Sequence, residues 1–180
     1  MVTSNREILI DADVVSHFVT AGKAGILKQI FPGNTIRMLD KVHKELQDWP
    51  NDNMRAAVSE LLSKKQVKLM DFPEDNITIL MEYAWIKTAL MKGDGESACL
   101  AVARHNKHIL ASSNLRDIKT YCNTHNIDYL TTMDFLCEAV RRAIFTETDA
   151  NAFIQTVKKA RGKLPVNTMA EYSCREIPFL

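Results

Sequence analysis

Acidic side chains stand beside apolar or helix-forming segments at several separate places in this sequence, and carboxylates so placed can do metal chemistry. The acids in question are Asp11, Asp13, Glu45, Asp94, Glu96 and Asp117. A carboxylate at the edge of a sheet costs free energy unless it is paired or bound to a cation. Hard oxygen ligands of this kind suit Mg²⁺ or Mn²⁺, which can activate water and neutralise charge on a phosphate. The acids therefore predict a divalent-metal site, provided that the fold brings them together.

Alternating short apolar runs and helical patterns indicate how the acids are positioned. Strands are expected at residues 8–10, 35–39, 67–72, 109–111 and 129–131. Helices are expected at 14–30 with a break near Gly22, then at 40–46, 52–65, 74–92, 96–106, 115–123, 132–144 and 149–162, with Asp40 and Thr132 as caps. This alternation predicts a three-layer α/β/α fold around a five-stranded parallel sheet, plus a C-terminal helix and tail. Ligands bind beyond the carboxyl ends of such strands, where Asp11 and residues 112–114 follow their strands directly.

Size and charge limit the classes of protein to consider. The chain has 180 residues, with 23 Lys and Arg against 22 Asp and Glu, and 46% of its residues are hydrophobic. These values fit one domain with an appendage and exclude a disordered chain or a polycation of the histone type. We expect a domain at 1–146, and a helix and tail at 147–180 that pack on it or on a partner.

The basic residues at 158–163 allow two interpretations. They can form a solvated face, or they can contact an RNA backbone, because a local basic strip suffices for phosphate contact.

Neither a membrane-spanning run nor a leader peptide is expected from the sequence, which favours a cytoplasmic protein. In that compartment, the four widely spaced cysteines are expected to be buried free thiols. They are Cys99, Cys122, Cys137 and Cys174.

Five sequence pieces together resemble the PIN-domain ribonucleases, many of which are toxins of toxin–antitoxin pairs. They are I-L-I-D-A-D-V-V-S at 8–16, V-H-K-E-L at 42–46, G-D-G-E-S-A-C-L-A-V-A at 93–103, I-L-A-S-S-N-L-R-D-I at 109–118 and Y-L-T-T-M-D-F-L at 129–136. They occur in the family's order and at its usual spacing over residues 7–145. The resemblance implies a five-stranded parallel sheet, a metal-dependent site of three or four acids, and cleavage of single-stranded or loop RNA.

Carried over by position, the resemblance implies metal-binding roles for Asp11, Glu45 and Glu96. Asp94 beside Glu96 is a further candidate ligand. The fourth acid departs from the family's pattern, because this chain has Ser112-Ser113-Asn114 where members often carry T-D-D or S-N-D. Asp117, one helical turn further on, is the candidate substitute, and Ser113 could instead bind metal through water.

Each candidate also has a plain structural interpretation. Asp13, Ser113 and Asn114 can simply cap helices, and Asp94 can be a first-turn acid favoured by the helix dipole. Glu45 can be a solvated helix acid beside Lys41 and Lys44, and Asp117 can form a salt bridge with Arg116 or Lys119.

The leading hypothesis is a Mg²⁺- or Mn²⁺-dependent endoribonuclease with Asp11, Glu45, Glu96 and Asp117 as catalytic residues. As a toxin it would act on RNA, pair with a small antitoxin protein and form a homodimer, as the resemblance implies. The missing fourth acid motivates a second hypothesis, a catalytically weak PIN-like module that binds RNA or a protein. A phosphatase of the haloacid dehalogenase kind is a distant third, because Asp94 precedes Ser113 instead of following it.

Overall fold

A five-stranded, wholly parallel sheet forms the centre of the protein, in a computed structural model that describes residues 6–90 and 92–180. Its strands are β1 (Ile8–Ile10), β2 (Ile36–Leu39), β3 (Lys68–Met70), β4 (Ile109–Ala111) and β5 (Tyr129–Leu130), in the spatial order β3-β2-β1-β4-β5. Residues 1–5, together with residue 91 of the helix expected at 74–92, lie outside the described residues. The parallel sheet confirms the predicted architecture.

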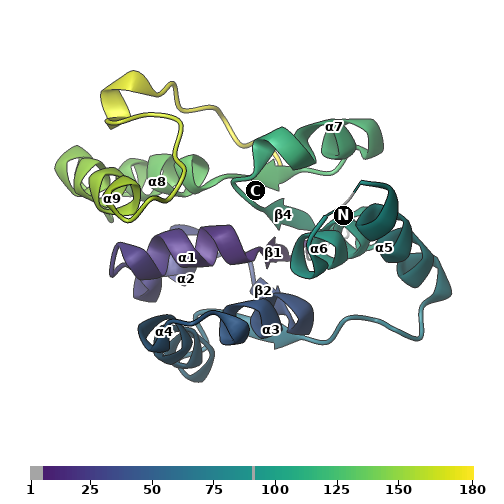
Figure 1. Ribbon diagram of the computed structural model, residues 1–180. Helices are drawn as coiled ribbons and strands as arrows, with labels where there is room; N and C mark the ends of the chain where they lie inside the picture. The colour runs from purple at the N-terminus through teal and green to yellow at the C-terminus, as the bar shows by residue number, and fades with distance from the viewer. Residues whose placement is uncertain (1–5, 91) are drawn as a thin grey trace.

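Helices cover both faces of this sheet. They are α1 (Ala12–Thr20), α2 (Leu27–Ile30), α3 (Asp40–Asp48), α4 (Asp52–Ser63), α5 (Ile77–Ala89), α6 (Asp94–Asn106), α7 (Leu115–His125), α8 (Thr132–Arg141) and α9 (Glu147–Lys159), with short 3-10 turns at Ala24–Ile26 and Met169–Glu171. Figure 1 shows α1, α4, α8 and α9 on one side of the strands and α5, α6 and α7 on the other. Helix α3 contacts both α4 and α6. Among the described residues, no helix combines the length and apolar character needed to cross a bilayer.

The direction of strand addition reverses at β1, which pairs with β2 on one side and β4 on the other. Ile10 lies opposite Ala111, and the backbone N–H of Asp11 donates to the Ala111 carbonyl at 2.9 Å. The carboxyl ends of β1 and β4 therefore meet at the topological switch point, where ligands bind in open parallel sheets.

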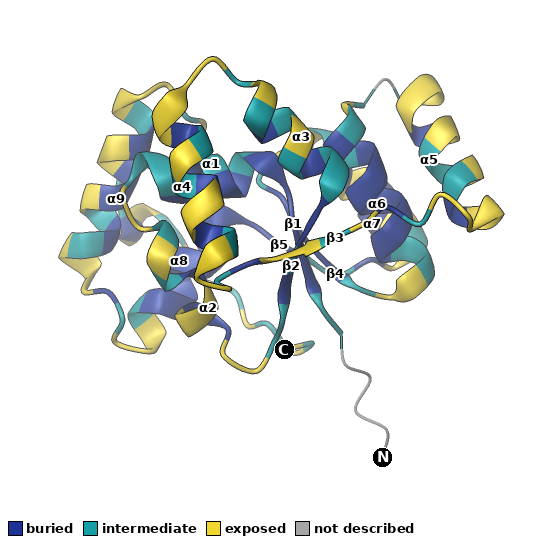
Figure 2. Cartoon of the chain, turned by 90° about the horizontal axis from the view of Figure 1, so that it is seen from below, coloured by how far each residue is buried: buried dark blue, intermediate teal, exposed yellow. Residues whose placement is uncertain are grey.

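The core extends from the sheet to the C-terminal helix. The residues of β1 and β4 are fully buried, as a strand covered on both faces requires, and Figure 2 shows these strands in the buried colour. The ring of Phe18 on α1 packs edge-to-face against Phe135 on α8 and Phe153 on α9, at centroid distances of 5.6 and 4.9 Å. Helix α9 therefore shares its core with the helices of the sheet domain.

Some helix starts differ from the expected positions by one or two residues. Asp40 and Thr132 are the first helical residues of α3 and α8, so the caps expected there are wrong. The N-cap of α8 is Thr131, which forms a capping box with Asp134. Helix α6 begins at Asp94 and not at Glu96.

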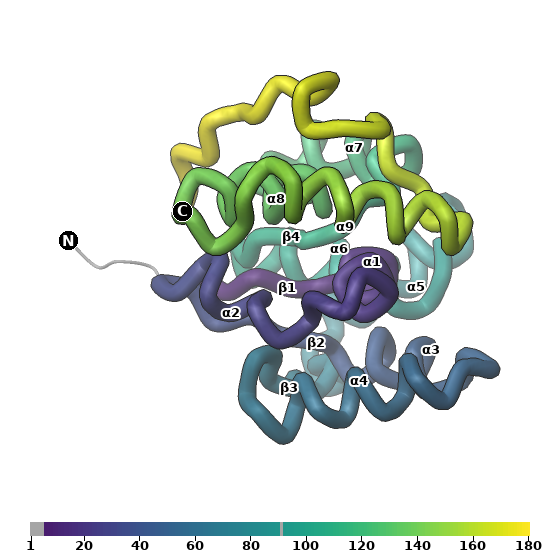
Figure 3. The backbone as a smooth tube through the Cα atoms, turned by 90° about the vertical axis from the view of Figure 1, so that its left-hand side faces the viewer, coloured from purple at the N-terminus to yellow at the C-terminus, as the bar shows by residue number. Residues whose placement is uncertain are grey.

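The C-terminal tail, residues 160–180, carries one clear correction. Cys137 on α8 and Cys174 in the tail form a disulfide across 37 residues, so the expectation of four free thiols is wrong for this pair. Cys99 and Cys122 are free and buried, as expected. Figure 3 shows the yellow tail leaving the end of α9 and running back beside α8 and α9 to the C-terminus, a path that no sequence periodicity indicated.

Candidate active site

Asp11 is the most deeply placed acid of the site. It follows β1 directly and is only 6% exposed. It is also the N-cap of α1, because its Oδ1 accepts a hydrogen bond from the Ala12 N–H at 2.8 Å. Burial raises its pKa well above the ordinary value, and repulsion from Asp13, Glu96 and Glu45 raises the pKa further. The fold thus places a carboxylate where its negative charge is disfavoured.

Asp13 connects the ends of β1 and β4. Its Oδ1 accepts from the Val14 N–H, and its Oδ2 accepts from the Ser113 N–H at 2.7 Å. The cap that we expected of Asp13 is therefore provided by Asp11, while Asp13 fixes the loop after β4. Burial raises the pKa of Asp13, although the Ser113 N–H opposes that shift.

Glu45 reaches the site from α3 by meeting the start of α6. Its Oε1 accepts a hydrogen bond from the Gly95 N–H at 2.8 Å. A Cβ atom at position 95 would lie 2.7 Å from Glu45 Oε2 and 3.0 Å from a Val42 methyl group. With a Cβ at this position, the Glu45 carboxylate and the Val42 methyl group would both have to shift, so the second glycine of the G-D-G-E run keeps Glu45 in its observed place.

Glu96 lies opposite the loop after β4. Its Oε1 accepts from Asn114 Nδ2 at 3.1 Å, and the same Nδ2 donates to Asp117 Oδ2 at 2.8 Å. Burial raises the pKa of Glu96, which the nearby ammonium of Lys92 partly offsets. Asn114 holds the N-cap position of α7, but its side chain makes no capping hydrogen bond and binds these two carboxylates.

We call Asp11, Asp13, Glu45 and Glu96 the acid cluster. Cys99, buried on α6, has a pKa raised by burial and by the negative charges of all four. In the described part of the chain, no three acid, histidine or cysteine side chains lie close enough to chelate one ion as they stand. The acids are therefore neighbours that repel one another, and they do not form a closed ligand cage.

The three remaining candidate residues, Asp94, Ser113 and Asp117, have their main contacts outside the acid cluster. Asp94 accepts from Tyr83 Oη at 2.8 Å and pairs with Lys87, both on α5, and these contacts lower its pKa. Asp94 and Glu96 are two residues apart on a helix, so their side chains point in different directions. Of these two acids, Asp94 contacts α5 and only Glu96 belongs to the acid cluster.

Ser113 belongs to a hydroxyl network. Its Oγ accepts from the Thr132 N–H at 2.9 Å and lies 2.7 Å from Thr132 Oγ1. Thr132 Oγ1 in turn lies 2.9 Å from Nδ1 of His17. Ser113 thus joins the loop after β4 to α8 and is not a cap of α7.

Asp117 stands beside the acid cluster, where two cations balance its charge. Lys92 Nζ lies 3.4 Å and Arg116 Nε 3.6 Å from Asp117 Oδ1. The hydrogen bond from Asn114 is the main reason that its pKa is lowered, and Lys92 contributes. The salt bridge to Arg116 that the sequence allowed is therefore present.

Lys92 is the residue of this region whose position the sequence did not indicate, and Asn114, expected at most as a cap, binds two carboxylates instead. The Lys92 side chain is only 11% exposed, so the cation is held close to Glu96 and Asp117. The one available signal was its place directly before the G-D-G-E run.

The donor chemistry of the acid cluster fits a small hard cation. Three of its carboxylates have raised pKa values from burial, and their negative charges face one another. A divalent ion would remove both penalties at once, and oxygen donors are those that Mg²⁺ and Mn²⁺ prefer.

Comparison with known proteins gives a match among solved structures. No family model matches the sequence, and no curated protein matches it. Among solved structures, the chain is similar to a chain in the crystal structure of VapBC2 from Rickettsia felis. That structure contains VapBC2 bound to a DNA fragment from its own promoter. The match has a TM-score of 0.52 and 14% identity, and it covers 69% of this chain and 97% of the other. The order β3-β2-β1-β4-β5, the helices on both faces and this match together give the protein a PIN-like fold.

Proposed function

We propose that the protein is a metal-dependent endoribonuclease in which Asp11, Glu45 and Glu96 bind one Mg²⁺ or Mn²⁺ ion. The observation that carries this proposal is the buried Asp11 carboxylate, which faces three other acids at the switch point of a parallel sheet. A protein retains such a destabilising arrangement when function requires it.

The chemistry assigns separate tasks to the residues around the acid cluster. When bound, the cation would neutralise negative charge on the scissile phosphate. Glu96 can orient water and accept its proton through Oε2, which has no hydrogen-bond partner among the described residues. Lys92 would attract the phosphate to the site, and Gly95 keeps Glu45 in place.

Asp94, Ser113 and Asp117 have supporting roles in this proposal. Asp94 forms a salt bridge with Lys87 on α5, and the Ser113 hydroxyl is hydrogen-bonded to Thr132. We therefore propose neither as a direct ligand. Asp117 would fix Asn114 and, through it, the Glu96 carboxylate.

Cleavage of a fluorogenic single-stranded RNA in Mn²⁺ tests the proposal. Asp11→Asn and Glu45→Gln should each lower the rate at least about a hundredfold, because direct ligands should matter more than the groups that orient them. Asp48→Asn is the matched control on α3, since Asp48 is exposed and pairs with Lys44. Equal cleavage by wild type and Asp11→Asn would reject the site.

A catalytically weak module that binds RNA or a protein is the second candidate. It is favoured by the fourth position, where Asn114 stands and where Asp117 is already paired with Lys92 and Arg116. Calorimetry with Mn²⁺ separates the two candidates, because no binding at millimolar metal would favour the weak module.

A toxin role, a small antitoxin partner that covers the acid cluster, a homodimer and a cytoplasmic location are part of the same proposal. They are supported by the PIN-like fold and by the match to a VapBC2 chain. Expression of the chain alone should arrest growth, and Asp11→Asn should not. Light scattering across protein concentrations checks the dimer, which a constant monomer mass would contradict.

A further inference from the structure

A cavity of about 760 Å³ lies directly beside the acid cluster, between the sheet domain and the C-terminal tail. Asp13 and Asp117 line the side toward the acids, while Lys163, Leu164 and Tyr172 provide the tail wall. The volume is in the range of pockets that bind small organic ligands. None of the roles assigned above uses this cavity.

The tail wall is fixed in place by several contacts. Asn151 Oδ1 accepts from the Met169 N–H at 2.7 Å, and Gln155 Nε2 donates to the Asn167 carbonyl at 2.7 Å. Arg175 binds both carboxylate oxygens of Asp134 at 2.8 and 2.7 Å. The cavity is therefore preformed, so that a ligand need not order the chain on binding.

The lining combines an aromatic ring and apolar side chains with a few polar groups. Tyr172, Met133, Leu164 and Pro165 offer surfaces for a flat, partly apolar ring. His17 is only 7% exposed and lines the cavity, and its Nε2 has no hydrogen-bond partner among the described residues. A planar heterocycle with polar edges fits this combination, because aromatic side chains stack on every nucleobase.

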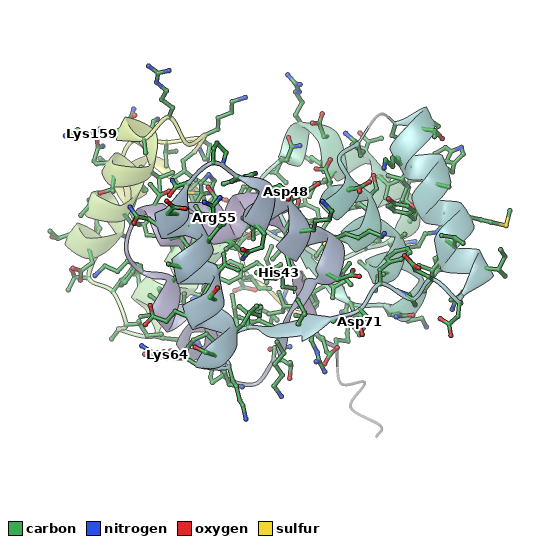
Figure 4. All side chains as sticks on the ribbon, turned by 60° about the horizontal axis from the view of Figure 1, so that its bottom comes forward. His43, Asp48, Arg55, Lys64, Asp71 and Lys159 are labelled. Atoms are coloured by element: carbon green, nitrogen blue, oxygen red, sulfur yellow. A yellow bond between two sulfur atoms is a disulfide. The ribbon has the colours of Figure 1, made fainter. Side chains whose placement is uncertain are left out.

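Two cations at the cavity add affinity for phosphate. Arg116 and the exposed Lys163 both line it. Lys163 ends the basic run at 158–163, so one residue of that run reaches the cavity. Lys158 and Lys159 do not line it: Lys158 donates to the Val166 carbonyl at 3.2 Å, and Lys159, the last residue of α9, is exposed (Figure 4).

We propose that this cavity binds one nucleotide of a single-stranded RNA, next to the phosphate held at the acid cluster. The base stacks on Tyr172 among Met133 and Leu164, and Lys163 and Arg116 contact the RNA backbone. This inference rests on the proposed function, because it names the part of the substrate that the tail recognises.

Binding without cleavage tests the cavity separately from catalysis. The probe is a fluorescein-labelled single-stranded RNA hexamer of mixed sequence, titrated with the full chain in EDTA and followed by fluorescence anisotropy. Tyr172→Leu should raise the dissociation constant about tenfold, within the range for the loss of one base–aromatic stack. Tyr172→Phe keeps the ring and should bind like wild type.

A matched pair of lysines tests the electrostatic contact. Lys163→Gln should weaken binding severalfold and make the salt dependence shallower by about 0.7 in log–log slope, as expected for one lost phosphate contact. Lys159→Gln, in the same basic run but outside the lining of the cavity, should change neither. Lys163 is exposed, so this comparison holds even if Tyr172→Leu does not fold by circular dichroism.

Two results would overturn the inference: no binding by wild type in EDTA, or equal effects of Lys163→Gln and Lys159→Gln. The proposed function fails on a different result, namely intact RNA binding with no cleavage in Mn²⁺.

Discussion

At the residue scale, the carboxylates of the acid cluster that we propose for metal binding are also expected to destabilise the folded protein when no metal is bound. Burial and repulsion from three neighbouring acids both disfavour the charged form of the Asp11 carboxylate and so raise its pKa. A group whose pKa is raised in the folded state destabilises that state whenever it is ionised. Asp11, which we propose as a metal ligand, should therefore lower the stability of the metal-free protein.

Asp11→Asn should stabilise the metal-free protein. The amide oxygen can still accept from the Ala12 N–H, so the cap on α1 is kept while the negative charge is removed. We expect the free energy of unfolding in EDTA to rise by about 0.5–2 kcal/mol, the usual gain from a single stabilising substitution. Urea unfolding measures the change, with Asp48→Asn as the exposed control, and a loss of stability would contradict this view of the site.

His17 should make stability depend on pH in the acid range. Burial lowers its pKa from 6.5 to about 4. Because its folded pKa is below the unfolded value, the unfolded chain takes up the proton first, and stability falls as pH drops from 6.5 to 4. The loss is up to about 3 kcal/mol, at 1.4 kcal/mol for each unit of pKa.

His17→Gln should remove this contribution. The acid cluster works in the opposite direction, because its raised pKa values favour the folded state as the carboxylates become protonated. The measurement is therefore the difference between wild type and variant in unfolding free energy from pH 7 to 4. Parallel curves for the two proteins would show that His17 is not the group responsible.

At the element scale, the close approach of α3 and α6 depends on one glycine. Gly95→Ala should displace the Glu45 carboxylate from the α6 N-terminus, because the new Cβ meets Glu45 Oε2 and Val42. We expect a loss of about 1–3 kcal/mol, typical of overpacking. Gly33→Ala is the control, since a Cβ there meets nothing within 4 Å; equal unfolding midpoints for the two variants would contradict the steric role.

Arg175 anchors the tail to α8. Its guanidinium binds the buried Asp134 carboxylate, whose side chain is 2% exposed, and also donates to the Tyr129 carbonyl at 2.6 Å. Arg175→Ala should lower stability by about 2–4 kcal/mol, because removing one partner leaves a buried charge unpaired except for its capping hydrogen bonds. Arg141→Ala, which breaks a more exposed pair with Glu138, should cost less than about 1 kcal/mol by thermal unfolding.

The sequence predicted the elements well where apolar runs are continuous, and less well at helix starts. β1 and β4 match residue for residue, because three fully buried residues give an unambiguous pattern. The start of α6 was predicted at Glu96, two residues late, and Asp94 stayed open between a metal ligand and a first-turn acid of the helix. In the structure Asp94 is a first-turn acid of α6, and its carboxylate contacts Tyr83 and Lys87 on α5, which no periodicity of the sequence indicated.

At the scale of the whole molecule, the tail is the part that the sequence could not position. Residues 164–180 have no hydrophobic period, so neither their path nor the pairing of Cys174 with Cys137 could be inferred from spacing. The three acids of the predicted core, by contrast, approach one another because parallel strands bring their carboxyl ends to one edge. The difference is between contacts dictated by topology and contacts made by individual side chains.

The disulfide closes a loop that contains α9 and the tail wall of the cavity, so its loss should lower the stability of the whole protein. Cys137→Ala with Cys174→Ala should lower the free energy of unfolding by roughly 3–4 kcal/mol, the loop-closure contribution for a separation of 37 residues. Reductant should lower the melting temperature of wild type and leave the double variant unchanged, because Cys99 and Cys122 are free thiols in both. Since Arg175 still holds the tail, RNA binding should weaken less than in Tyr172→Leu. A wild-type melting temperature indifferent to reductant would show that the pair does not staple the tail in solution.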